Sequence, residues 1–169
     1  MMAHDERRGI RRLFGHWLET CGNRRLPALD DVSAGMARDL WERSFVIDVS
    51  GGPGVYRISR FGAALRDQFG ADYAGRSVDS LPGPLVGDAL DSCHVAVASA
   101  KPFTRSDDDT LFFGRSVRYR LILLPVGSSD ARVEALIGTV DYALRGAAAA
   151  APGPSNAAAR HSPSRAHGA

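Results

Sequence analysis

The sequence predicts an α+β fold in which a five-stranded antiparallel sheet carries helices on one face and follows an amphipathic N-terminal helix. Three patterns carry this prediction. Apolar residues recur at helical spacing before Cys21, alternation with a period of two begins at Phe45 and breaks at 51–54, and a second alternating run covers 117–124. A spacing of three and four indicates a helix with one apolar side, whereas a period of two indicates a strand.

The first predicted element is a helix from about Asp5 to Cys21. Its apolar side chains form a single stripe, and Gly22 with Asn23 supplies a stop. Aromatic side chains on such a stripe must be buried against something, either the same domain or a second subunit. The candidate interface residues on this helix are Ile10, Leu13, Phe14, Trp17 and Leu18.

The second group of elements is a short helix, a hairpin and a further helix. Val32, Met36 and Leu40 recur every four residues, which predicts a short helix. Residues 45–49 and 55–59 read as two strands joined by a Gly-Gly-Pro-Gly turn, the first with one buried face. A helix over 61–69 follows and ends at Gly70.

The second half of the chain is predicted as one long helix and three strands. The helix covers about 85–98, and residues 102–105 form a short edge strand before a solvated loop at 107–109. Residues 117–124 give the strongest strand signal, which Pro125 is expected to stop. Residues 133–142 form the last strand, in an antiparallel hairpin with the previous one.

Length and composition indicate one folded domain with two extensions. We expect a helix at 1–24, the domain at 25–145 and a disordered Ala/Pro/Ser-rich tail at 146–169. The net charge of +2 comes from two arginines in the tail, so the first 146 residues are neutral, which argues against nucleic-acid binding. The sequence lacks a signal peptide and an apolar stretch long enough to span a membrane, and we expect a cytoplasmic protein.

The order of two strands, several helices and three strands is that of a PAS domain. Further matching pieces are Pro27, Asp31, Val32, Met36, Leu40, 45–49, 56–58, 69–70, 73–76, 120–126, Val133, Leu136, Gly138 and Tyr142. On these residues the chain resembles, over residues 10–145, the bacterial PAS_5 family of small PAS proteins. The resemblance implies a PAS sheet, a sensory role in signal transduction and no catalytic motif.

His94 and Cys93 are the candidate residues for cofactor chemistry. Haem-binding PAS domains place a ligating histidine on a helix of this kind, but the apolar stripe centres on Cys93 instead, so haem is disfavoured. The flavin-adduct motif Asn-Cys-Arg-Phe-Leu is absent, which favours Cys93 as a small buried residue. Asp88 and Asp91 lie near both, yet a second pair of ligands at zinc-like spacing is missing. The sequence therefore requires no cofactor or metal.

A ligand pocket is expected between the helices and the sheet, if the protein has one. Core packing is the alternative for the same side chains. Arg57, Arg118 and Arg120 lie on strands and are candidates for an anionic ligand or simply for the surface. The pocket candidates are Tyr56, Phe69, Tyr73, Cys93, His94, Tyr119 and Leu121.

The function predicted from these patterns is binding rather than catalysis. We expect a sensory module that contacts another signalling protein, as a homodimer that uses the N-terminal helix. The alternative is a small-molecule or haem-binding sensor with its ligand between helices and sheet. An enzyme would need a converging polar constellation, and the sequence offers none.

Overall fold

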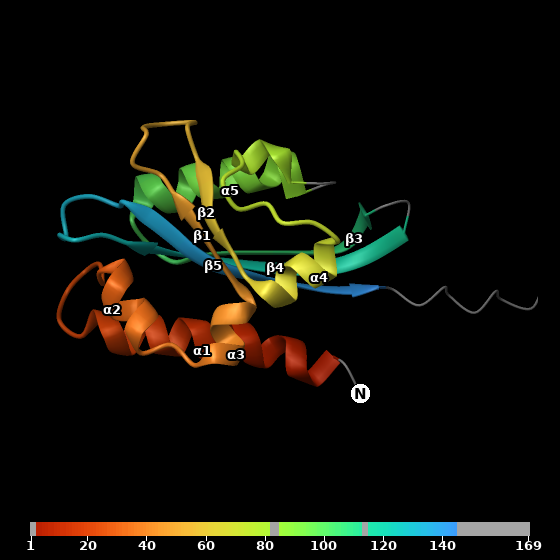
Figure 1. Cartoon of the computed structure of the whole chain (residues 1–169), viewed down its shortest axis with the longest axis horizontal. Helices are drawn as coiled ribbons and strands as arrows, with labels where there is room; N and C mark the ends of the chain where they lie inside the picture. Colours follow the sequence, from red (N-terminus) through yellow and green to blue (C-terminus); the bar gives the residue numbers. More distant parts are fainter. Residues whose placement is uncertain (1–2, 82–84, 113–114, 145–169) are drawn as a thin grey trace, which may run out of the picture.

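The structure is a computed structural model that describes residues 3–81, 85–112 and 115–144. Within these ranges the chain forms helices and strands in the order drawn in Figure 1. In chain order they are α1 (Ala3–Cys21), α2 (Leu29–Ala34), α3 (Arg38–Glu42), β1 (Ser44–Asp48), β2 (Arg57–Phe61), α4 (Ala63–Phe69), the 3₁₀ turn η1 (Val78–Ser80), α5 (Leu85–Ser99), β3 (Phe103–Phe112), β4 (Arg115–Val126) and β5 (Ala135–Leu144).

The strands form one five-stranded sheet in the order β2-β1-β5-β4-β3. Every neighbouring pair is antiparallel, and β5 lies between the first hairpin and the second. The last strand of the chain therefore joins two hairpins that are far apart in sequence. This confirms the predicted α+β fold, a five-stranded antiparallel sheet that follows an N-terminal helix.

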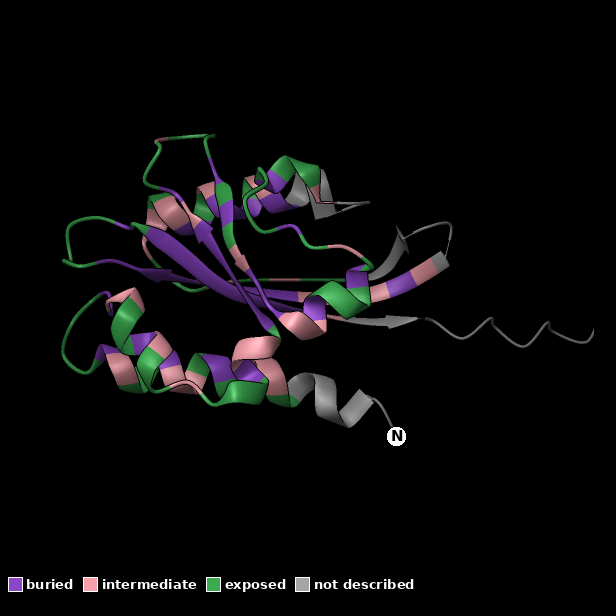
Figure 2. Ribbon diagram, in the orientation of Figure 1, coloured by how far each residue is buried: buried purple, intermediate pink, exposed green. Residues whose placement is uncertain are grey.

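Helices lie on both sides of the sheet, and each side has its own apolar core (Figures 1 and 2). On the first side α4, η1 and α5 cover side chains that include Phe45, Ile47 and Leu121. On the opposite side α1, α2 and α3 cover Val46 and Ile137, among others. β1 contributes to both cores, so the expectation that this strand has one buried face is wrong. The N-terminal helices α1, α2 and α3 bury its second face.

Two predicted helices differ in their limits. The short helix through Val32 and Leu40 is two helices, because α2 ends at Ala34 and α3 begins at Arg38. Phe61 belongs to β2 and pairs with Phe45, whereas α4 begins only after Gly62. The helix end at Gly70 is confirmed, since this residue has a φ of 71°, in the left-handed region that glycine adopts most easily.

The two strands at the far edge are longer than the sequence suggested. β3 continues through Asp107–Asp109 with an irregularity between Asp107 and Thr110, so these residues are not a loop. β4 continues through Pro125, which pairs with Leu136. The Val126 carbonyl accepts a hydrogen bond from the Glu134 amide of β5, so the backbone nitrogen of Pro125 points to the opposite side, toward β3. The pairing of β3 with β4 begins only at Phe103 and Leu123, so no β3 residue lies opposite Pro125. Its missing N–H therefore costs no sheet hydrogen bond.

The predicted N-terminal helix, the long helix and the last hairpin are confirmed as α1, α5 and the β4–β5 pair. The predicted tail at 146–169 lies outside the described residues.

Candidate functional site

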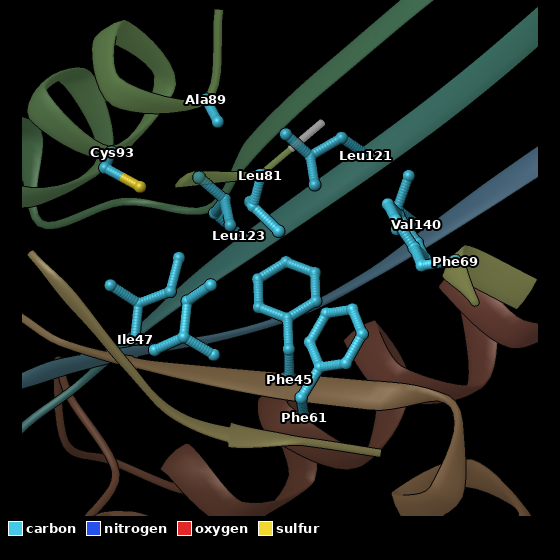
Figure 3. Close-up of a pocket in the computed structure, with 11 residues that line it drawn as sticks. Phe45, Ile47, Phe61, Phe69, Leu81, Ala89, Cys93, Leu121, Leu123 and Val140 are labelled. Carbon is cyan, nitrogen blue, oxygen red and sulfur yellow. The ribbon is translucent and has the colours of Figure 1, made fainter. Parts of the chain in front are cut away.

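A small cavity lies between α5 and the sheet, where the pocket was expected (Figure 3). It has a volume of about 30 Å³ and is lined by side chains from β1, β2, β4, β5, α4, α5 and the connection after η1. The rings of Phe45 and Phe61 lie side by side and extend toward Leu121, and Cys93 points in from α5. The full lining is Phe45, Ile47, Ile58, Phe61, Phe69, Leu81, Ala89, Cys93, Leu121, Leu123 and Val140.

Three of the seven predicted pocket residues line this cavity, namely Phe69, Cys93 and Leu121. Three others belong to the same core without reaching the cavity, namely Tyr56, Tyr73 and Tyr119. The ring of His94 is half-buried and meets the ring of Tyr56 edge to face, with centroids 5.1 Å apart. The structure thus places His94 against an aromatic ring and outside the cavity lining.

Two aromatic side chains of the lining, Phe61 and Phe69, form a cluster of three rings with Tyr73, which lies outside the lining. Phe61, Phe69 and Tyr73 meet edge to face, with centroid separations of 5.4, 5.5 and 6.2 Å. Edge-to-face contacts favour a fixed relative orientation of the rings. The cluster therefore holds the end of α4 and the 70–73 segment in one arrangement against β2.

Burial suppresses acid–base chemistry at this site. It raises the pKa of the Cys93 thiol to about 12, so the nucleophilic thiolate is scarce at neutral pH. Burial also raises the pKa of Tyr56. The groups around the cavity are neutral and apolar, an environment that suits an apolar occupant and gives no help to a charged transition state.

Haem does not fit this site. A cavity of about 30 Å³ is far below the roughly 300–1,000 Å³ of ligand pockets, and the lining includes no histidine. The described residues also contain no group of three or more His, Cys, Asp or Glu side chains placed to hold a metal ion. Both cysteines, Cys21 and Cys93, are free thiols.

Sequence reasoning missed most of the cavity lining because it favoured aromatic and reactive residues, whereas most of the lining is aliphatic. It also left out the aromatic lining residues Phe45 and Phe61. Ile47, Ile58 and Val140 lie on the α5 side through the pairing of their strands, and Leu81 comes from a connection. Alternation within 45–49 and 117–124 does mark the correct face of β1 and β4. It does not show which of those side chains leave space between them.

The five candidate interface residues of α1 divide into two groups. Leu13 and Trp17 are buried in the core of their own domain, and the Trp17 indole donates to the Pro125 carbonyl at 2.9 Å. Ile10 is half-buried against the same core. Phe14 and Leu18 remain exposed by 38% and 55%. Leu13 and Trp17 therefore pack within the chain, and the exposed pair is what the helix presents to solvent.

The three candidate arginines do not come together. Arg57 lies on the edge strand β2 and donates to the Gly75 carbonyl at 2.9 Å. Arg118 and Arg120 lie on β4, separated from β2 by two strands. Arg120 pairs across the sheet with Asp141. A common anion site from these three residues is therefore excluded by the strand order.

Solved structures match the chain, whereas no family model, including that of PAS_5, and no curated protein does. The PAS domain of Bordetella pertussis BvgS has 19% identity and a TM-score of 0.48, covering 60% of this chain and 76% of that one. A sensory box sensor histidine kinase from Vibrio cholerae has 13% identity and a TM-score of 0.46, covering 64% and 89%. The PAS domain of histidine kinase ThkA has 16% identity and a TM-score of 0.43, and the match covers 59% of this chain and 96% of that one.

Within the described residues, no helix combines the length and apolar character needed to cross a membrane.

Proposed function

We propose that this chain is a non-catalytic sensory module of the PAS type that passes its signal to another signalling protein by direct contact. It acts as a homodimer, and the contact surface is the exposed side of α1. The PAS-like sheet and the apolar cavity support a binding role. The observation that carries the dimer is the exposed pair Phe14 and Leu18, one helical turn apart on α1.

The sheet is also open at β3, on the side that α1 covers. Thr104 and Ser106 of β3 pair with Ile122 and Arg120 of β4, so they share the face that α1 covers. Both are nevertheless exposed, which shows that α1 leaves β3 uncovered. A second copy of α1 laid over Phe14, Leu18 and this part of β3 buries the exposed apolar side chains of both copies.

The signal is carried by the sheet, because β1 contributes side chains to both cores. A ligand or partner that changes how α4 and α5 pack on Phe45 and Ile47 also acts on Val46, the residue between them in β1. Val46 belongs to the α1 core, the apolar core that α1, α2 and α3 cover. Such an effector shifts the population of α1 arrangements only to the extent that it binds one arrangement more tightly.

The test is the mass of the full chain measured by light scattering after size exclusion. We expect a dimer for the native sequence and a monomer for Leu18→Glu, because a charge replaces the more exposed apolar side chain. Val95→Glu is the matched control, since Val95 is exposed by 51% on α5, on the opposite side of the sheet. A monomeric native chain, or a Leu18→Glu variant that stays dimeric, contradicts the proposal.

A second function, sensing of a small apolar molecule, is favoured by the cavity beside Cys93. Its lining has room for only a few non-hydrogen atoms without rearrangement, so a larger ligand has to displace α5 from the sheet. Native mass spectrometry beside denaturing mass spectrometry distinguishes this function, because a retained ligand adds mass only under native conditions. Equal masses from freshly purified protein count against it.

A further inference from the structure

A second hollow lies on the α1 side of the sheet, at the end where β1 turns into β2 and β4 turns into β5. It is a groove of about 430 Å³ formed by α2, the ends of β1 and β2, and the β4–β5 turn. This volume is within the range of small-molecule sites, unlike that of the cavity beside Cys93. Its lining consists of Leu29, Asp48, Ser50, Ser59, Val126, Gly127, Arg132, Glu134 and Ala135.

The groove combines an apolar floor with charged walls. Val126 and Ala135 are buried members of the α1 core, and Leu29 packs against the same core. Asp48 pairs with Ala135 across the sheet, which places Asp48 on the same face as that floor. The groove is therefore apolar at its floor and charged at its solvent-facing rim. This is the usual composition of a site for a small organic molecule.

Two opposite charges are held at a defined separation in this groove. Asp48 Oδ1 accepts a hydrogen bond from the Ser50 amide at 2.8 Å, and Arg132 Nη2 donates to the Ser50 carbonyl at 3.1 Å. The carboxylate and the guanidinium thus lie on either side of one residue, less than about 10 Å apart. A carboxylate has about four lone-pair positions and a guanidinium has five N–H donors, so each keeps capacity for a ligand.

The other charges near the groove are already engaged. Both carboxylate oxygens of Glu134 accept hydrogen bonds from Ser128. Arg57, the cross-strand partner of Asp48, donates to the Gly75 carbonyl. Each groove charge thus has an opposite charge near it, Arg57 beside Asp48 and Glu134 beside Arg132, and each keeps acceptor or donor capacity for a ligand. The positive and the negative group of a ligand should therefore contribute comparably to affinity.

We propose that this groove binds a small zwitterion of the amino-acid type, with its ammonium at Asp48, its carboxylate at Arg132 and an apolar side chain over Val126 and Ala135. Ser50 presents an N–H to Asp48 and a C=O to Arg132, the same polarity that an amino acid offers over a similar length. The site lies on the face opposite the cavity beside Cys93, so it is independent of the sensing of a small apolar molecule proposed for that cavity. Because α2 forms one wall, an occupant contacts both the N-terminal helices and the sheet.

The experiment compares three probes that share one phenyl body and differ in charge. L-Phenylalanine carries both charges, phenethylammonium only the positive one and 3-phenylpropanoate only the negative one. Each is titrated into the ¹⁵N-labelled full chain while the amide signals of Ser50, Gly127 and Ala135 are followed. We expect L-phenylalanine to bind roughly tenfold more tightly than either phenethylammonium or 3-phenylpropanoate.

Two conservative variants locate the contacts. Asp48→Asn keeps an acceptor for the Ser50 amide and Arg132→Gln keeps a donor for its carbonyl, so both should fold. Each should weaken L-phenylalanine roughly tenfold. Asp72→Asn and Arg66→Gln are the matched controls, because this exposed pair, 3.1 Å apart, joins α4 to the connection that follows it, well away from the groove.

The proposal fails if L-phenylalanine up to its solubility limit leaves the amide signals of Ser50, Gly127 and Ala135 unmoved. It also fails if the three probes bind equally, or if the controls weaken binding as much as the groove variants do.

Discussion

Gly62 lies where the chain passes from β2 into α4, and the backbone around it leaves no room for a side chain. A Cβ at this position would overlap the carbonyl oxygen of Glu42 and lie 2.8 Å from that of Ser44. The Gly62 amide also donates to the Ser44 carbonyl at 3.0 Å. Glycine is therefore required by this close approach, since its φ of −64° is one that any residue adopts.

Gly62→Ala is expected to destabilise the fold by about 3 kcal/mol or more, because backbone atoms rather than a flexible side chain must move. Gly15→Ala is the matched control. Gly15 lies within α1 and a Cβ there meets nothing within 4 Å, so alanine should stabilise the helix by about 0.5–1 kcal/mol. Urea unfolding of the two variants measures both effects. Similar urea midpoints for the two variants would show that the backbone of Glu42, Ser44 and Gly62 moves apart at little cost and would contradict the prediction.

At the scale of elements, the sequence predicted strands and helices wherever one short window contains the whole signal. The run at 117–124 alternates regularly, and β4 contains it. The α1 stripe and the glycine end of α4 are equally local. β3 was only partly predicted, because three consecutive aspartates favour a loop on local grounds and pairing with β4 overrides that preference. Pro125 stays in β4 because β3 does not extend far enough to need its N–H.

The candidate sites were predictable to different degrees for the same reason. Phe69, Cys93 and Leu121 follow from knowing which face of each element is apolar. The groove does not, because Asp48, Arg132 and Leu29 come from three separate parts of the chain. They meet only through the register that sets Asp48 opposite Ala135. No local pattern contains that register.

The connection between α1 and α2 is held to the β4–β5 turn by one side chain. Asp130 Oδ1 accepts hydrogen bonds from the amides of Arg25 and Leu26, at 2.9 and 3.0 Å. The Gly127 amide adds a bond to the Pro27 carbonyl at 3.0 Å. These contacts fix where α2 begins relative to the sheet, and hence the position of Leu29.

Asp130→Ala should therefore cost about 1–2 kcal/mol of unfolding free energy, since two amides lose a charged acceptor. Asp130→Asn should cost less, because its amide oxygen still accepts. Hydrogen exchange checks the mechanism by a separate route. The amides of Arg25 and Leu26 should exchange faster in the alanine variant while those of β4 keep their protection. Loss of protection across the whole sheet would mean that Asp130 supports more than this connection.

For the molecule as a whole, the decisive property is that one sheet separates two cores. The side facing α1 contains Val46, Ile122, Leu124 and Ile137, none of them more than 2% exposed. Leu13, Trp17 and Cys21 cover them from α1. The N-terminal helix is thus part of the fold as well as the proposed dimer contact. These two roles use different sides of the same helix.

Removing residues 1–22 should consequently abolish cooperative folding rather than simply convert a dimer into a monomer. Each large apolar side chain returned to water costs about 1.5–3 kcal/mol, and a domain of this size has only about 5–15 kcal/mol in total. We expect the shortened chain to lose its near-ultraviolet circular dichroism and its sharp thermal transition. Leu18→Glu in the full chain should keep both, because Leu18 faces solvent. A shortened chain that unfolds at the native midpoint would show that α1 contributes little to the second core. Only a point substitution on the outer side of α1, and not a deletion, separates dimer loss from loss of fold.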